Sequence, residues 1–160
     1  MRGRQKLGLL VAAIGDEGFV DAAAGRGRHV HIVAESDLND VRLLLSPQRG
    51  GYGLDAQWSD DFHHMTHAAL TGERHGYYVD YGAPGQFPRL LEDTFVLNGC
   101  YSVHRDRCHG GSDAGLSGDR FVVCVQNHDQ VGNRAAGERL AALISPPAQR
   151  LAASLLLLAP

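Results

Sequence analysis

The sequence has no cluster of basic residues, and Lys6 is its only lysine. Its 15 basic and 18 acidic side chains are mixed along the chain and leave a formal net charge of −3. Proteins that bind nucleic acid or anionic membranes through charge typically carry a basic patch or run. The charge pattern therefore argues against both partners, and a neutral or small ligand fits better.

Long apolar runs are also missing. Residues 7–14 and 155–159 are apolar, but a membrane span needs about 20 such residues. The basic start followed by residues 7–14 imitates a signal peptide, yet Asp16 and Glu17 follow at once without a convincing cleavage site. There are only three cysteines, an odd number that does not indicate a disulfide framework. We expect a cytoplasmic protein with reduced thiols.

The chain is long enough for one globular domain, with 160 residues of which 44% are apolar. Residues 1–28 are rich in glycine, alanine and arginine, and only residues 17–24 have the composition of a short helix. The pattern becomes regular from His29 onward. We therefore expect a divergent N-terminal segment, residues 1–28, followed by the main folded part, residues 29–160.

Three stretches have the pattern of short strands, and polar residues follow each of them. They are residues 29–34, 54–58 and 121–125, and the last is a β-branched and aromatic run typical of a strand buried on both faces. Helical patterns lie between the strands, and no hairpin signal is evident. Such an order predicts an α/β fold of parallel βα units. At roughly 30 residues per unit, the chain would form part of a (β/α)8 barrel.

The clearest helix signal follows the second strand. Ser59 suits an N-cap, Phe62, Met65 and Ala69 repeat at helical spacing, and Gly72 suits the end of the helix. Further helices are expected at residues 86–97 and 133–144, and a last one begins after Ser145 with Pro146 in its first turn. We expect residues 98–120 to form a long loop without regular structure.

Carboxylates at the carboxyl ends of different parallel strands can meet at one ligand, one as a proton donor and the other as a stabilising charge. Glu35 and Asp129 fit that arrangement, but spacing also allows Glu35 in a surface loop and Asp129 as a helix cap. Trp58 is either a stacking platform for a sugar ring or a core aromatic residue. Two metal sites are weaker alternatives, because neither has an established ligand spacing: His63 with His67, and the loop of Cys100, His104, Cys108 and His109.

Four segments carry a resemblance to a known family: residues 31–40 (HIVAESDLND), 51–64 (GYGLDAQWSDDFHH), 70–74 (LTGER) and 126–134 (QNHDQVGNR). They resemble the maltooligosyltrehalose trehalohydrolases, a family in the α-amylase superfamily of glycoside hydrolases. The Asn-His-Asp triplet is shared by the superfamily, whereas residues 55–64 together with 127–134 are specific to this family. The resemblance implies part of a (β/α)8 barrel, roughly strands five to seven with their helices.

The resemblance also implies a role for each matching residue. Glu35 would be the general acid/base, Asp129 would bind the distorted sugar and support the oxocarbenium-like transition state, and His128 would hydrogen-bond that sugar. The implied reaction is hydrolysis of the α-1,4 bond next to the terminal trehalose, with no metal or organic cofactor. The sugar-binding cleft would be lined by Trp58, Asp60 and Asp61.

The family's nucleophile has no counterpart in this sequence. It is an Asp after the fourth barrel strand in a Gly-x-Arg-x-Asp-Ala-x-His-like motif, which residues 1–28 do not contain. We therefore expect the isolated chain to have little or no activity. The alternatives are a noncatalytic glucan-binding remnant and, less favoured, a metal-binding interaction module. Exposed sheet edges would also favour self-association.

Overall fold

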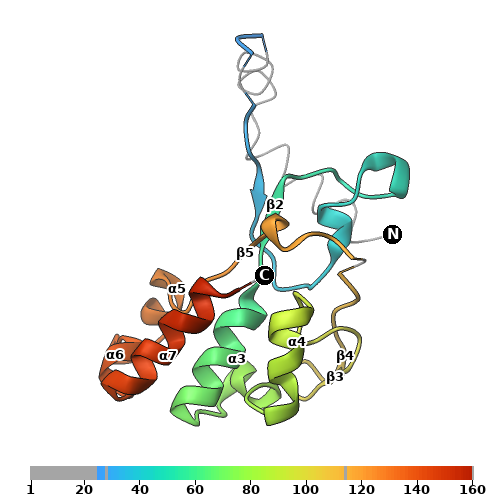
Figure 1. Ribbon diagram of the computed structural model, residues 1–160. Coiled ribbons are helices and arrows are strands. Elements are labelled where there is room, and N and C mark those ends of the chain that lie inside the picture. The colour runs from blue at the N-terminus through green and yellow to red at the C-terminus, as the bar shows by residue number, and fades with distance from the viewer. Residues whose placement is uncertain (1–24, 28, 114, 160) are drawn as a thin grey trace. The chain divides into compact units, whose positions relative to one another are not determined.

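The computed structural model of the protein describes residues 25–27, 29–113 and 115–159 (Figure 1). The helix expected at residues 17–24 lies outside them. The chain divides into two compact units, residues 1–32 and 33–160, and all of the regular elements below belong to the second. No helix in the described ranges is long and apolar enough to cross a membrane.

A three-stranded parallel sheet forms the centre of the second unit. It consists of β1 (Val33–Ala34), β2 (Ala56–Trp58) and β5 (Phe121–Val122), in the order β1-β2-β5. Val33 pairs with Ala56, and Trp58 pairs with Val122. The parallel βα arrangement predicted from the sequence is therefore confirmed. The paired regions are shorter than predicted, because residues 29–32 and 123–125 lie outside the ladder.

Helix α3 (Asp60–Thr71) follows β2 directly and has the predicted ends. Ser59 is the extended N-cap residue, and Gly72 ends the helix with a φ of 77°. The Ser59 hydroxyl does not cap the helix, since it donates to the Thr94 carbonyl oxygen 3.0 Å away. Every residue from 61 to 68 is buried. The helix therefore lies inside the protein, and its histidines need internal hydrogen-bond partners.

Two other predicted helices are wrong in extent. The prediction for residues 86–97 is met only by α4 (Phe87–Glu92), because residues 95–97 enter the core as non-helical chain. Residues 133–144 do not form one helix: α5 (His128–Gly132) precedes them and only α6 (Leu140–Leu143) lies within them. The last helix, α7 (Pro146–Leu157), begins after Ser145 as predicted.

The prediction that residues 98–120 form a loop without regular structure is wrong, because the segment contains an antiparallel hairpin. Strand β3 (Tyr101–Ser102) pairs with β4 (Arg107–Cys108). The Asp80 carboxylate holds its turn by accepting hydrogen bonds from the Ser102 hydroxyl at 2.5 Å and the Val103 amide at 2.6 Å. The short 3-10 helices of the unit are η1 (Val41–Leu43), η2 (Pro47–Arg49), η3 (Gly76–Asp80), η4 (Pro84–Gln86) and η5 (Gly118–Arg120).

The hydrophobic core surrounds α3. Figure 1 shows α7, α3 and α4 side by side, and α3 packs against both of the other helices. Phe62, Met65 and Ala68 of α3 contribute to a cluster that also contains Leu90 of α4 and Val96. Because α3 starts two residues after β2 and is fixed on several sides, the carboxylates of its first turn have a rigid support.

Candidate active site

Acidic side chains gather where the three parallel strands end. Glu35 directly follows β1, Asp60 lies two residues after β2, and Asp129 lies in α5, beyond β5. Burial raises the pKa of Asp60 to about 6, and the charges of Asp37, Asp61, Glu35 and Asp129 add to this rise. Each of these four carboxylates is therefore close enough to Asp60 to disfavour its ionised form, and we call Glu35, Asp60 and Asp129 the acidic cluster of the strand ends.

Asp129 does not cap helix α5. Asn127 is the N-cap residue, and its side-chain oxygen accepts a hydrogen bond from the Asp129 amide at 2.8 Å. Gln130 completes the cap by accepting from the Asn127 amide at 2.7 Å. The Asp129 side chain is 47% exposed and that of His128 is 90% exposed, with His128 Nε2 3.1 Å from Asp129 Oδ1. Both side chains can therefore be reached by a ligand.

Glu35 is also exposed, in a loop that the β3–β4 hairpin supports. Arg105 from the hairpin turn forms an ion pair with the Asp37 carboxylate at 2.9 Å. His109 Nε2 donates to the Asp37 carbonyl oxygen at 2.8 Å, and Asn39 takes a left-handed conformation with a φ of 51°. The loop after β1 is thus held by a part of the chain about 70 residues away, while Glu35 faces solvent.

Asp61 does not line a surface cleft, although the sequence predicted that it would. It is 2% exposed and accepts hydrogen bonds from the Tyr81 hydroxyl at 2.6 Å, the Leu97 amide at 2.8 Å and Asn39 Nδ2 at 2.9 Å. Burial raises the pKa of Asp61 and these hydrogen bonds oppose that rise. We therefore assign Asp61 a structural role, which is to join the loop after β1 to the chain after α4.

Trp58 and Asp60 are partly exposed at the carboxyl end of β2. Burial raises the pKa of the Cys124 thiol to about 11, and the charge of the nearby Asp60 carboxylate adds to the rise. The thiol is therefore protonated at neutral pH and is a weak nucleophile.

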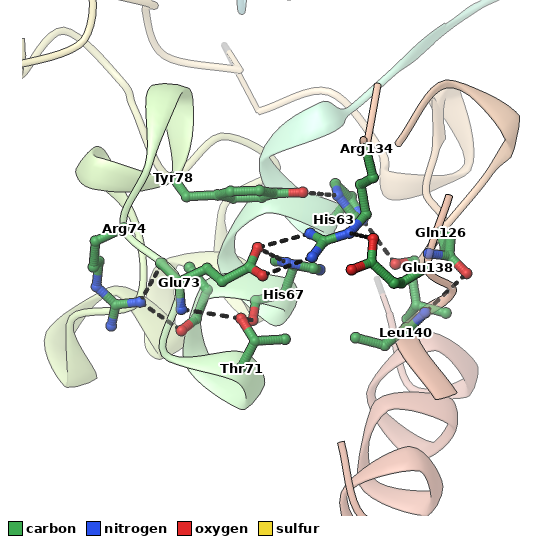
Figure 2. Close-up of polar contacts among 12 residues, drawn as sticks. His63, His67, Thr71, Glu73, Arg74, Tyr78, Gln126, Arg134, Glu138 and Leu140 are labelled. Carbon is green, nitrogen blue, oxygen red and sulfur yellow. Dashed lines mark hydrogen bonds and ion pairs between the residues drawn. The ribbon is translucent and has the colours of Figure 1, made fainter. Parts of the chain in front are cut away.

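A network of polar residues near the end of α3 was not predicted from the sequence (Figure 2); His63, His67 and Tyr78 are buried, and Glu73 and Arg134 are partly buried. Glu73, just after α3, binds Arg134 through two parallel bonds, each 2.9 Å, and accepts a further bond from His67 at 2.8 Å. His63 bridges the Val125 carbonyl oxygen at 2.7 Å and the Tyr78 hydroxyl at 2.9 Å. These contacts connect α3 to both sides of the segment that carries His128 and Asp129.

The same contacts bear on the metal alternatives. Both ring nitrogens of His63 are hydrogen-bonded to the protein, and Nε2 of His67 is bonded to Glu73. In the hairpin loop, Nε2 of His109 is bonded to the Asp37 backbone. Cys100, Cys108 and Cys124 are free thiols. These histidine nitrogens therefore already have partners within the chain, whereas Nδ1 of His67 has no hydrogen-bond partner among the described residues.

A surface hollow of about 370 Å³ lies beside the loop after β1, between residues 38–42 and 110–112. Its volume falls within the usual range of small-molecule sites. None of the six site residues predicted from the sequence lines it. We therefore build the candidate site on the acidic cluster rather than on this hollow.

Parallel βα units with carboxylates at the strand ends are typical of α/β-barrel enzymes, and comparison with known proteins identifies the class. No family model matches the chain. A crystal structure from Salmonella typhimurium, described as a candidate alpha amylase, resembles the fold with a TM-score of 0.75 and 34% identity, over 83% of this chain and 23% of its own.

Curated relatives narrow the class. The chain is similar to malto-oligosyltrehalose trehalohydrolases, with 50% identity to that of Saccharolobus solfataricus over 81% of this chain and 43% identity to that of Rhizobium sp. (strain M-11) over 98%. The protein of Arthrobacter ramosus is 46% identical over 88% of the chain. The chain spans about a quarter of the length of these relatives. By this resemblance it is a glycoside hydrolase sequence of the trehalohydrolase family.

Proposed function

We propose that this chain provides the acid/base and the transition-state-stabilising side of a glycoside hydrolase site. The observation that carries the proposal is the acidic cluster of Glu35, Asp60 and Asp129 at the carboxyl ends of three adjacent parallel strands. In barrels of parallel βα units, this is the face on which active sites are built. The similarity to trehalohydrolases supports the same role.

Glu35 is the proposed general acid/base. Its exposed position after β1 would let it donate a proton to the leaving glycosidic oxygen and later take one from water. Asp129, as a carboxylate, would stabilise positive charge on the distorted sugar, and His128 would donate a hydrogen bond to one of its hydroxyls. Asp60 and Trp58 would contact the substrate at the end of β2. Asp61 is left out because its carboxylate is enclosed.

The proposed bond is the α-1,4 link between a maltooligosaccharide and its terminal trehalose, so trehalose would be released. The names of the relatives support this substrate. In this proposal β1, β2 and β5 are the fifth, sixth and seventh strands of the barrel, the chemistry needs no metal or organic cofactor, and the protein is cytoplasmic.

A retaining glycosidase also needs a nucleophile about 5–5.5 Å from the acid/base. The family's nucleophile motif does not occur in this sequence. We therefore propose that the 160-residue chain alone has little or no turnover. A second candidate function is glucan binding without cleavage through Trp58 and the loop that carries Asp129, and the partial exposure of both side chains favours it.

A chimera tests the main proposal. Residues 31–159 of this chain would replace the matching part of the Saccharolobus solfataricus relative, and trehalose release from maltotriosyltrehalose would be measured. We expect turnover, and we expect Glu35→Gln in the chimera to lower it by roughly 10²–10⁴-fold because the proton donor is lost. Glu92→Gln, on the exposed face of α4, is the control and should not change the rate. Normal turnover in the Glu35→Gln chimera would refute the acid/base role.

A further inference from the structure

Helix α3 is attached to both sides of the segment 126–134, which carries His128 and Asp129. On the first side, His63 contacts the Val125 carbonyl oxygen at 2.7 Å. A carbonyl oxygen can only accept, so Nδ1 of His63 must carry a proton. Burial lowers the pKa of His63 to about 4, so the ring is neutral and its Nε2 accepts from the Tyr78 hydroxyl at 2.9 Å.

On the other side, Glu73 holds Arg134. The two parallel bonds, each 2.9 Å, form the planar arrangement in which a carboxylate and a guanidinium fit best. The hydrogen bond from Arg134 is the main cause that lowers the pKa of Glu73 to about 2, and His67 adds to it. Glu73 is therefore ionised at any pH at which the chain would be used, and the contact is fixed in both distance and angle.

Packing alone does not explain these polar residues. His63 and His67 are 0% and 2% exposed, and a buried histidine is less favourable than an apolar residue of similar size unless it gains hydrogen bonds. His63 is hydrogen-bonded to the Val125 carbonyl oxygen and the Tyr78 hydroxyl. His67 is hydrogen-bonded to Glu73 through Nε2. Figure 2 shows them converging with Arg134 between α3 and the segment. His63 of α3 thus holds the chain just before the segment, and Glu73, just after α3, holds Arg134, its last residue.

We propose that His63, Glu73 and Arg134 are positioning residues that hold the segment 126–134, and with it the Asp129 carboxylate, in place for sugar binding. Their link to sugar binding rests on the proposed function, whereas the attachment itself does not. None of the three needs to touch the sugar. They act by limiting the motion of the two points between which His128 and Asp129 lie.

Hydrogen–deuterium exchange of the 160-residue chain tests the attachment. We expect the amides of residues 126–134 to exchange about tenfold faster in Glu73→Gln, which removes the charge and the paired geometry. Arg134→Lys should have a similar effect, because it keeps the charge but cannot form two parallel bonds. The control is Glu138→Gln, which removes the other carboxylate on Arg134, 3.2 Å away, without touching α3. It should exchange within twofold of the wild type.

Several results would overturn the proposal: unchanged exchange in Glu73→Gln and Arg134→Lys, an equal rise in Glu138→Gln, or a rise spread evenly over α3 and the sheet. Titration with maltotriosyltrehalose gives the second readout. The affinity should fall in Glu73→Gln and Arg134→Lys and stay unchanged in Glu138→Gln. Normal affinity in the first two would reject the positioning role. If the wild type itself does not bind the sugar, glucan binding by the chain alone is refuted, the chimera still decides the acid/base role, and exchange still decides the attachment.

Discussion

Replacing Asp60 by asparagine should stabilise the chain at neutral pH while removing a proposed substrate contact. Asp60 belongs to the acidic cluster, and its ionised form is disfavoured in the folded state. Burial and then the charges of Asp37, Asp61, Glu35 and Asp129 raise its pKa from 3.8 to about 6. Asparagine has nearly the same shape and carries no charge, so it relieves both effects.

The magnitude follows from the pKa. A rise from 3.8 to about 6 corresponds to about 3 kcal/mol of unfavourable free energy at pH 7. Asp60 is only partly buried, and solvent screening reduces this to about 1–2 kcal/mol. As the first residue of α3, Asp60 also gains about 0.3–1 kcal/mol from the helix N-terminus, which asparagine would lose. The relief of burial and repulsion exceeds this loss, so we expect Asp60→Asn to raise the free energy of unfolding by about 1 kcal/mol.

The sign of the pH dependence is specific to a raised carboxyl pKa. Between about pH 4 and pH 6 the folded chain binds more protons at Asp60 than the unfolded chain does. The wild type therefore loses stability as the pH rises through this range. Asp60→Asn lacks that loss, so the two proteins should be about equally stable near pH 4 and should differ by about 1 kcal/mol at pH 7.

Urea unfolding and thermal melting at several pH values measure this difference, with an expected rise of about 2–4 °C in Tm at pH 7. Asp119→Asn is the matched control, because Asp119 is an exposed carboxylate in η5, before the amino end of β5. It should leave the pH dependence unchanged. A less stable Asp60→Asn at pH 7, or an equal gain from Asp119→Asn, would show that Asp60 is not under repulsion from the cluster.

Two further predictions concern stability and assembly. Asp61→Ala should destabilise the chain by about 3 kcal/mol or more in urea unfolding, because it leaves the Leu97 amide and the Tyr81 hydroxyl without their partner in the interior. Tyr81→Phe, which removes one hydroxyl bond to Asp61, should cost only about 1 kcal/mol. In the described part of the chain β1 and β5 each pair with one strand only, and Leu157 is 84% exposed. We therefore expect self-association in sedimentation velocity, and a monomer at all concentrations would contradict it.

The elements with local signals were predictable from the sequence. Helix α3 has its ends at Ser59 and Gly72 because an extended N-cap and a left-handed glycine are properties of single residues. The helix predicted at residues 86–97 ends at Glu92 because of a distant contact. The Leu97 amide donates to the Asp61 carboxylate, 36 residues earlier in the chain. Helical spacing alone carries no information about such a partner.

The candidate site likewise has a part that could be predicted from the sequence and a part that could not. That Glu35, Asp60 and Asp129 follow three parallel strands could be predicted from the order of strand and helix signals. The different roles of Asp60 and Asp61 could not, because the apolar stripe predicted for α3 marks only one face, whereas every residue from 61 to 68 is buried. The Glu73–Arg134 pair joins residues 61 positions apart and leaves no spacing signal.

The carboxylates at the strand ends and the charged pair near the end of α3 affect stability in opposite directions. At the strand ends burial and the nearby charges, including those of Glu35 and Asp129, disfavour the ionised form of Asp60, which opposes folding. Near the end of α3 Glu73 is matched by Arg134, so this pair adds no repulsion of its own. The strand-end carboxylates thus lower stability, whereas the Glu73–Arg134 pair contributes to it. A chain selected only for stability would have neutralised Asp60, and its unrelieved charge is therefore an argument for a ligand that meets it.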